Sequence, residues 1–142
     1  LFVRMALNAM DGMLAREHHQ QSALGAVLNE LGDVASDLAL YLPFALVPGV
    51  SPVAVVGLCL LAVISEMMGV VGVQIGASRR YDGPLGKSDR AVLFGTLGLL
   101  LGTGIVGPTF ATWVLAIALL PAALTIFNRA RKALAEVREG RP

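Results

Sequence analysis

The feature that most restricts the fold is the segment 91–128, which contains no charged side chain. It is far longer than the roughly 20 residues that an α-helix needs to cross about 30 Å of hydrocarbon. Gly107 and Pro108 interrupt it, so it predicts two membrane spans rather than one. Hydrophobic residues make up 56% of the 142 residues and charged residues 15%, a composition typical of membrane proteins.

Three earlier apolar segments, 1–15, 25–47 and 53–77, predict helices of the same kind. The first reads as the end of a span, so we expect the domain to be truncated at its N-terminus. Glu66 interrupts the third segment, and a charge at that depth requires a partner. The sequence therefore predicts an all-α, multi-pass transmembrane helix bundle. It would be one domain, residues 1–142, with five spans of which the first is incomplete.

The distribution of basic residues predicts how these spans are oriented. Ten of the 11 lysines and arginines lie near Arg16, in 79–90 or in 129–142. The turns at Pro48 and Pro108 contain none. Because cytoplasmic loops carry an excess of Lys and Arg, we expect the basic segments and the C-terminus to face the cytoplasm, in a bacterial cytoplasmic membrane.

Glycines and aromatic residues predict contacts of the later spans. The pairs Gly72/Gly76 and Gly98/Gly102 fit the small-x3-small pattern of closely packed membrane helices. Tyr41 lies near the end of its predicted span, where aromatic side chains commonly anchor a helix at the membrane interface.

Polar side chains within the apolar segments are the candidates for function. The stretch between Asn8 and Asp37 carries five of the chain's 10 acidic residues. Charged side chains are costly at membrane depth and normally face a cavity. Asn8 and Asp11 are three residues apart, and Asn29, Asp33 and Asp37 are each four apart. Each set would share one face of a helix, and two such faces would enclose an anionic pocket that opens near the cytoplasm.

The pattern resembles the signature of the CDP-alcohol phosphotransferase family, Asp-x2-Asp-Gly-x2-Ala-Arg-x8-Gly-x3-Asp-x3-Asp. The corresponding residues keep every spacing and are Asn8, Asp11, Gly12, Ala15, Arg16, Gly25, Asn29 and Asp33. The two asparagines stand where the family has acids. The resemblance implies a six-span membrane enzyme of phospholipid biosynthesis. Such an enzyme transfers a substituted phosphoryl group from a CDP-linked donor, chiefly CDP-diacylglycerol, to an alcohol and releases CMP.

The resemblance also implies a role for each matched position. The metal ligands for Mg2+ or Mn2+ would be Asn8, Asp11, Asn29 and Asp33. The donor would be bound by Asp11, Gly12, Ala15, Arg16 and Gly25. Asp33 would be the general base. In a second register, Asn29-x3-Asp33-x3-Asp37, Asp33 would be a ligand and Asp37 the base, and both registers remain open.

A second, shorter resemblance concerns the acceptor. The segment 86–90, Gly-Lys-Ser-Asp-Arg, is similar to an acid–arginine pair found in family members that use phosphorylated acceptors. Arg79, Arg80, Lys87 and Arg90 are therefore candidates for binding an acceptor phosphate. The competing interpretation is a solvated loop that faces lipid headgroups.

The expected partners are the CDP-activated lipid donor, the alcohol acceptor and membrane lipid. The resemblance also suggests a homodimer. Nucleic acid is not expected, because no basic patch is interleaved with aromatic residues. Asn8 and Asn29 make a second hypothesis plausible, a catalytically impaired relative that acts as a membrane scaffold or partner subunit.

Overall fold

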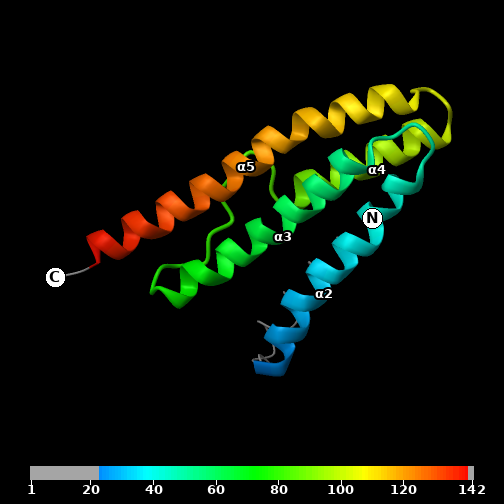
Figure 1. Cartoon of the computed structure of the whole chain (residues 1–142). Coiled ribbons are helices and arrows are strands. Elements are labelled where there is room, and N and C mark those ends of the chain that lie inside the picture. Colours follow the sequence, from blue (N-terminus) through cyan, green and yellow to red (C-terminus); the bar gives the residue numbers. More distant parts are fainter. Residues whose placement is uncertain (1–22, 141–142) are drawn as a thin grey trace. The chain divides into compact units, whose positions relative to one another are not determined.

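The computed structural model describes residues 23–140, and every regular element in this part of the chain is a helix. The elements in order are α2 (Ala23–Tyr41), the 3-10 helix η1 (Leu42–Leu46), α3 (Pro52–Gln74), α4 (Lys87–Gly102) and α5 (Pro108–Glu139) (Figure 1). The all-α prediction is confirmed for these residues. The chain divides into two compact units, Leu1–Leu40 and Tyr41–Pro142, and each is described by itself.

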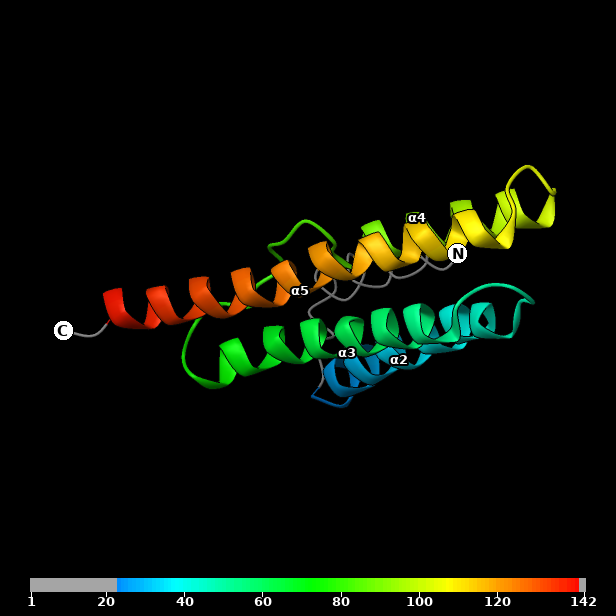
Figure 2. The same ribbon diagram turned by 45° about the horizontal axis from the view of Figure 1, so that its top comes forward.

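In the second unit, α3 and α5 run side by side in the same direction, and α4 runs in the opposite direction (Figures 1 and 2). Small and aliphatic residues fill the α3–α5 contact. The buried ones include Val55, Leu58 and Ala62 of α3 and Ala111, Leu115, Ala118 and Ala122 of α5. Cys59 of α3 is also buried, as is common for a cysteine that packs as a small apolar side chain.

The two uncharged turns of this unit lie next to each other. The backbone N–H of Ser51 donates to Thr112 Oγ1 at 2.9 Å. A Cβ on Gly49, which has a φ of 84°, would lie 3.1 Å from Pro108 Cβ. Ser51 also caps α3, since its Oγ accepts from the N–H of Ala54 at 3.4 Å. The predicted turns at Pro48 and Pro108 thus form one end of the unit.

The charged segments form another part of the same unit. After α3, the loop 75–86 returns along the C-terminal half of α5. Three contacts join them: Ser78 N–H to Glu136 Oε1 at 3.0 Å, Lys132 Nζ to Asp82 Oδ1 at 2.6 Å and Leu85 N–H to Thr125 Oγ1 at 3.0 Å. The basic loop and the basic tail therefore lie together, apart from the uncharged turns.

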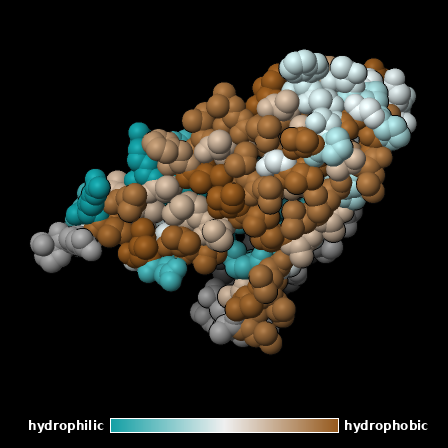
Figure 3. All heavy atoms as spheres, in the orientation of Figure 1, coloured by the Kyte–Doolittle hydropathy of each residue, from teal (hydrophilic) through white to brown (hydrophobic). Residues whose placement is uncertain are grey.

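Two of the helices among the described residues, α3 and α5, are long and apolar enough to cross a membrane. Figure 3 shows the apolar surface along this unit, with hydrophilic atoms gathered at the C-terminal end of α5. With its 32 residues, α5 is about 48 Å long, so its charged last turns extend beyond a hydrocarbon core of about 30 Å. The count of five spans stays a prediction, and the first of them, 1–15, lies outside the described residues.

The predicted span 25–47 ends differently from expectation. The α-helix stops at Tyr41, and η1 follows with a proline in its first turn. This change brings the Tyr41 ring onto Phe94 of α4, with ring centroids 4.2 Å apart and planes 9° apart. Phe44 meets the same ring edge-on at 5.1 Å. The prediction of Tyr41 as an interface anchor is wrong, because this packing leaves it only 1% exposed.

The small-residue pairs each contribute one packing contact. A Cβ on Gly72 would lie 3.6 Å from Ala133 Cβ of α5, and one on Gly98 would lie 3.1 Å from the Phe44 ring. A Cβ on Gly76 or Gly102 would meet no atom within 4 Å. Gly76 instead supplies a φ of 93° just after α3, a conformation that glycine adopts without strain.

Candidate functional site

The acidic face predicted from the sequence lies on α2. Asn29, Asp33 and Asp37 follow one another at four-residue intervals in this helix. Since each residue of an α-helix advances by about 100°, they form one stripe. The exposed large apolar residues of α2 are Leu24, Val27, Leu28 and Leu31. By the same rotation these lie on the opposite side of the helix. The polar stripe and the apolar stripe are thus on opposite sides of α2.

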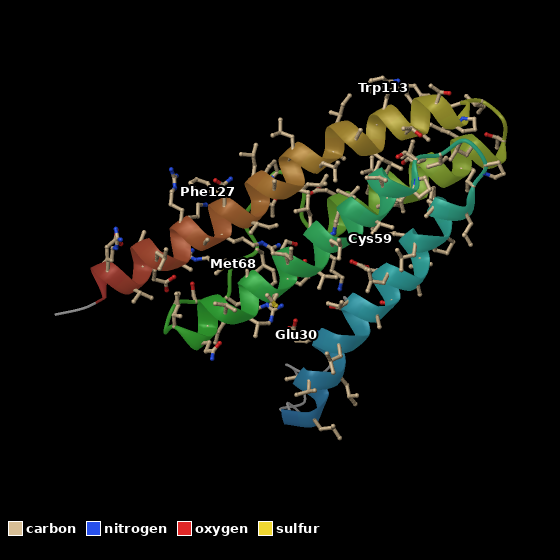
Figure 4. All side chains as sticks on the ribbon, in the orientation of Figure 1. Glu30, Cys59, Met68, Trp113 and Phe127 are labelled. Carbon is tan, nitrogen blue, oxygen red and sulfur yellow. The ribbon has the colours of Figure 1, made fainter. Side chains whose placement is uncertain are left out.

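The geometry and the charge of α2 describe the surroundings of its acids. Ser36 Oγ donates to Gly32 O at 2.6 Å and to Asp33 O at 3.2 Å, so its hydroxyl is satisfied within the helix. The Cα atoms of Asp33 and Asp37 are one turn, about 6 Å, apart. Glu30 adds a third carboxylate (Figure 4), and α2 contains no lysine or arginine. The helix therefore carries negative charge only.

The described part of the proposed metal site offers suitable ligand atoms. Asn29 and Asp33 present an amide and a carboxylate oxygen on consecutive turns, and Mg2+ prefers oxygen ligands. Within residues 23–140, no three His, Cys, Asp or Glu side chains gather closely enough to hold a metal ion. Asn29 and Asp33 thus fit a Mg2+ site as part of a ligand set, which would need the oxygen atoms of Asn8 and Asp11 to complete it.

The remaining signature residues fall before α2. Asn8, Asp11, Gly12, Ala15 and Arg16 lie outside the described residues, so their roles as ligands and donor-binding residues stay predictions. Gly25 lies in the first turns of α2 and is exposed. Its predicted role in binding the donor stays a prediction.

A second group of charged side chains joins the three helices of the other unit. Arg90 Nη2 of α4 donates to Glu66 Oε1 of α3 at 2.8 Å. Arg129 Nη1 of α5 lies 3.6 Å from the other carboxylate oxygen, Glu66 Oε2. Arg90 and Arg129 are 1% and 2% exposed, and Glu66 is 13% exposed. Two buried guanidinium groups therefore share one carboxylate, and the cluster carries an excess of one positive charge.

Other oxygen atoms of the chain also accept hydrogen bonds from the two arginines. Arg129 Nη1 donates to Ser65 O at 2.5 Å, and its Nε donates to Asp82 O at 3.3 Å. Arg90 Nη1 donates to Ser65 Oγ at 3.1 Å and to Leu85 O at 3.3 Å. The loop 75–86 therefore contributes carbonyl groups to the cluster as well as contacts along α5.

The four predicted acceptor-binding cations have different surroundings. Arg90 is buried in the cluster just described. Arg80 pairs with Glu136, and its Nη1 lies 3.9 Å from Asp82 Oδ2. The Arg79 guanidinium lies 5.4 Å from the centre of the Tyr81 ring. Lys87 is the first residue of α4, which begins four residues earlier than the predicted span. Phosphate binding by these residues stays a prediction.

The charge pairs of the loop also change the ionisation of Asp82. The hydrogen bond from Lys132 to the Asp82 carboxylate, with the charges of Lys132 and Arg80, lowers the pKa of Asp82 below its ordinary value, against a smaller opposing effect of burial.

Arg129 is the one member of the cluster that the sequence did not single out. It looked like the first residue of a charged tail, but α5 continues through it to Glu139. The buried residues of α5 from Ala118 onward are Ala118, Ala122, Thr125, Arg129 and Ala133. Their spacing of three or four residues is that of one helix face. This periodicity is the sequence signal that could have identified Arg129 as a buried residue. Glu66, whose partner the sequence did not name, pairs across helices with Arg90 and Arg129.

Comparisons with known proteins decide the family. The sequence model described as CDP-alcohol phosphatidyltransferase matches residues 1–130. The chain belongs to the CDP-alcohol phosphatidyltransferase family. It is 45% identical over 137 residues to the inner membrane protein YnbA of Escherichia coli strain K12, an alignment that covers 94% of this chain and 67% of that protein. No solved structure matches it.

Family membership confirms the resemblance drawn from the signature residues. The match includes both the segment before α2 and α2 itself. It also includes all three members of the Glu66–Arg90–Arg129 cluster, since Arg129 lies just inside the matched range. This family member carries two groups of charged side chains. One consists of the acids on α2, and the other is the Glu66–Arg90–Arg129 cluster, which joins α3, α4 and α5.

Proposed function

We propose that this chain is a membrane transferase that moves a substituted phosphoryl group from a CDP-linked donor, with CDP-diacylglycerol foremost, to an alcohol and releases CMP. The observation that carries the proposal is the polar stripe of α2. Asn29, Asp33 and Asp37 share one helix face. Asn29 and Asp33 stand where the family signature has its last two acids, and Asp37 extends the same face by one turn. Membership of the family supports the same reaction class.

In the proposed reaction, Asp33 takes the proton of the acceptor hydroxyl as that oxygen attacks the donor phosphorus. The new phosphorus–oxygen bond forms as the bond to the CMP oxygen breaks, and CMP leaves with its negative charge. A base that acts in this way must carry a free carboxylate and lie within hydrogen-bonding distance of the hydroxyl. Asp37, one turn further along α2, has this role in the second register.

A divalent cation such as Mg2+ would neutralise charge on the donor pyrophosphate when bound. With Asp33 as the base, Asn29 would hold it together with Asn8 and Asp11; in the second register, with Asp37 as the base, Asp33 would be a further ligand. Arg16 would hold a donor phosphate, for which a guanidinium provides paired donors. Because amides replace two acids of the signature, we expect weaker metal binding than a site with four carboxylates would give.

We propose that the protein spans the membrane several times, with its basic segments in the cytoplasm. The arrangement within residues 41–140 supports this topology. The uncharged turns are joined by the Ser51–Thr112 hydrogen bond, while the basic loop and tail are joined by the Asp82–Lys132 pair. Segments that should lie on the same side of the membrane are therefore neighbours, as the positive-inside tendency requires.

The competing function is that of a scaffold or partner subunit without catalysis, which the amides at positions 8 and 29 favour. Measuring the release of CMP distinguishes an enzyme from a scaffold. The chain in detergent micelles or nanodiscs is supplied with labelled CDP-diacylglycerol and a panel of alcohols, with Mg2+ or with a chelator. We expect CMP only with Mg2+, and its loss in Asp33→Asn. An intact, folded chain that releases no CMP with any alcohol would support the scaffold instead.

A further inference from the structure

One face of α5 is exposed along most of the helix. The large apolar side chains on it are at least 45% exposed and recur every three, four or seven residues: Trp113, Ile117, Leu120, Leu124, Phe127 and Leu134. This spacing is that of one face of a helix. Trp113 and Phe127 lie on the side of α5 that faces away from α3 (Figure 4). We call this surface the outer face of α5.

Two arginines extend the outer face toward the end of the helix. Arg131 follows Phe127 by four residues, and Arg138 follows Leu134 by four. Four residues turn an α-helix by about 400°, so each arginine lies within roughly 40° of the apolar residue before it. Both arginines are exposed. The outer face therefore changes from apolar to basic over the last turns of α5.

The other charged side chains near the end of α5 differ from these two arginines. Three of them have partners within the chain: Arg129 with Glu66, Lys132 with Asp82 and Glu136 with Arg80. Within residues 23–140, Arg131 and Arg138 form no ion pair. Glu139 directly follows Arg138 and so points about 100° away around the helix. The outer face thus ends in two positive charges that the described chain does not neutralise.

The length of the outer face fits a membrane. Trp113 and Arg131 are 18 residues apart, which is about 27 Å of helix and close to a hydrocarbon thickness of about 30 Å. Tryptophan is enriched at membrane interfaces, and an arginine near the end of a span extends its guanidinium to the headgroups. Trp113 and Arg131 would therefore lie at opposite interfaces, with the apolar part of the outer face between them.

An anionic phospholipid matches both parts of the outer face. Its acyl chains fit the exposed side chains of Leu124 and Phe127, and its headgroup phosphate accepts charge-assisted hydrogen bonds from a guanidinium. A zwitterionic lipid carries a cation of its own, which the arginines repel. An acidic protein segment would match the arginines but not the apolar residues next to them.

We propose that the outer face of α5 binds anionic phospholipid, with headgroup phosphate at Arg131 and Arg138 and acyl chains at Leu124 and Phe127. The inference rests on the membrane topology of the proposed function and not on its reaction. Both arginines lie beyond residue 130, where the family match ends, so the inference concerns a part of the chain outside that match.

The test uses a fluorescent reporter on the outer face. Trp113 is the only tryptophan of the chain, so Trp113→Phe with Phe127→Trp leaves one tryptophan, a turn before Arg131. This reporter chain is inserted whole into nanodiscs of phosphatidylcholine and phosphatidylglycerol in equal amounts. One sample contains brominated phosphatidylcholine and the other brominated phosphatidylglycerol. Because bromine quenches tryptophan only at close range, the difference in quenching identifies the lipid at the reporter.

We expect brominated phosphatidylglycerol to quench the reporter more strongly. Arg131→Gln should lower this preference, expressed as the ratio of the two association constants, by about fivefold, the contribution of one basic residue near an anionic surface. Removing both Arg131 and Arg138 should nearly abolish the preference. Arg131→Lys keeps the charge and should retain most of it.

The matched control is Lys132→Gln. It removes the same charge from the next residue, on the side of α5 that is joined to Asp82, and should leave the preference nearly unchanged. An equal loss in Lys132→Gln and Arg131→Gln would show a diffuse effect of charge and would overturn the proposal.

The reporter chain keeps both arginines, so it decides even if a variant does not fold. Equal quenching by the two lipids would overturn the proposal and leave the topology intact. Quenching by neither lipid would overturn it by showing that protein covers the outer face. A chain that does not insert into nanodiscs would contradict the proposed topology and the inference with it. CMP release from the same nanodiscs tests the reaction separately, and its absence leaves the lipid preference measurable.

Discussion

The charged side chains of the polar stripe of α2 differ from those of the Glu66–Arg90–Arg129 cluster in how their signs are combined. On α2 the charges are all negative, and Asp33 and Asp37 lie one turn apart. In the cluster each buried arginine contacts a carboxylate from another helix. Like charges at a four-residue spacing destabilise a helix, whereas opposite charges between helices can hold them together when their hydrogen bonds are complete.

The difference points to a binding role for the acids of α2 and a structural role for the cluster. Acids at this spacing repel one another along α2, which agrees with the proposed role of the stripe in binding a cation or a substrate. In the cluster, opposite charges from three helices meet, and oxygen atoms of the chain accept hydrogen bonds from both arginines. Removing a charge should therefore have opposite consequences in the two regions.

The largest effect is expected on activity at α2. Asp33→Asn should lower CMP release by roughly 10²–10⁴-fold, the usual contribution of a positioned general base. Its thermal stability should stay equal or rise, because a repulsion is removed. Glu139→Gln, at the exposed end of α5, is the control and should keep full activity. A greater loss in Asp37→Asn than in Asp33→Asn would assign the second register.

The next largest effect is expected on stability in the cluster. Arg90→Met should lower the free energy of unfolding by roughly 3–5 kcal/mol, because it leaves a buried carboxylate with only the longer contact to Arg129. Replacing all three members together, Glu66→Leu with Arg90→Met and Arg129→Met, should cost much less. Denaturation in mixed micelles measures both. Equal losses in the single and the triple variant would show that the charges are not coupled.

A smaller loss is expected where the loop meets α5. Gly83 has a φ of 143°, and a Cβ there would lie 2.4 Å from Thr125 Cγ2. Gly83→Ala should therefore reduce the unfolding free energy by about 1–3 kcal/mol through strain and overpacking. Gly102→Ala is the matched control, since its Cβ would meet no atom within 4 Å. A Gly83→Ala variant as stable as the control would show that this loop is not held against Thr125.

The smallest effect concerns pH and the Asp82–Lys132 pair. Because the folded-state pKa of Asp82 is lowered, the pair stabilises the protein above the unfolded pKa of about 3.9. That contribution is lost as the pH falls through the folded pKa. For a partly exposed pair it is at most about 1 kcal/mol. The difference in unfolding free energy between the wild type and Asp82→Asn is measured from pH 6 to pH 3 and should shrink toward zero. A difference that does not change with pH would contradict a stabilising Asp82–Lys132 pair.

The acidic stripe was predictable because it depends only on local spacing. Residues four apart in a helix share a face whatever the rest of the chain does, so Asn29, Asp33 and Asp37 needed no tertiary information. The turn at Pro48 and the break at Gly107-Pro108 were equally local, since proline restricts the backbone and glycine frees it at the residue itself. The cluster was not predictable in this way. Glu66, Arg90 and Arg129 are separated by 24 and 39 residues in the chain, and no local rule relates positions so far apart.

The sequence alone therefore determined the helical class, the apolar segments, the acidic stripe and, through the signature, the family. These follow from composition, periodicity and spacing, which act over a few residues. Only the tertiary structure decided that Tyr41 stacks on Phe94, that the basic loop lies along α5 and that Glu66 joins Arg90 to Arg129. Those contacts depend on how α3, α4 and α5 pack, because distant side chains meet only when the helices that carry them are brought together.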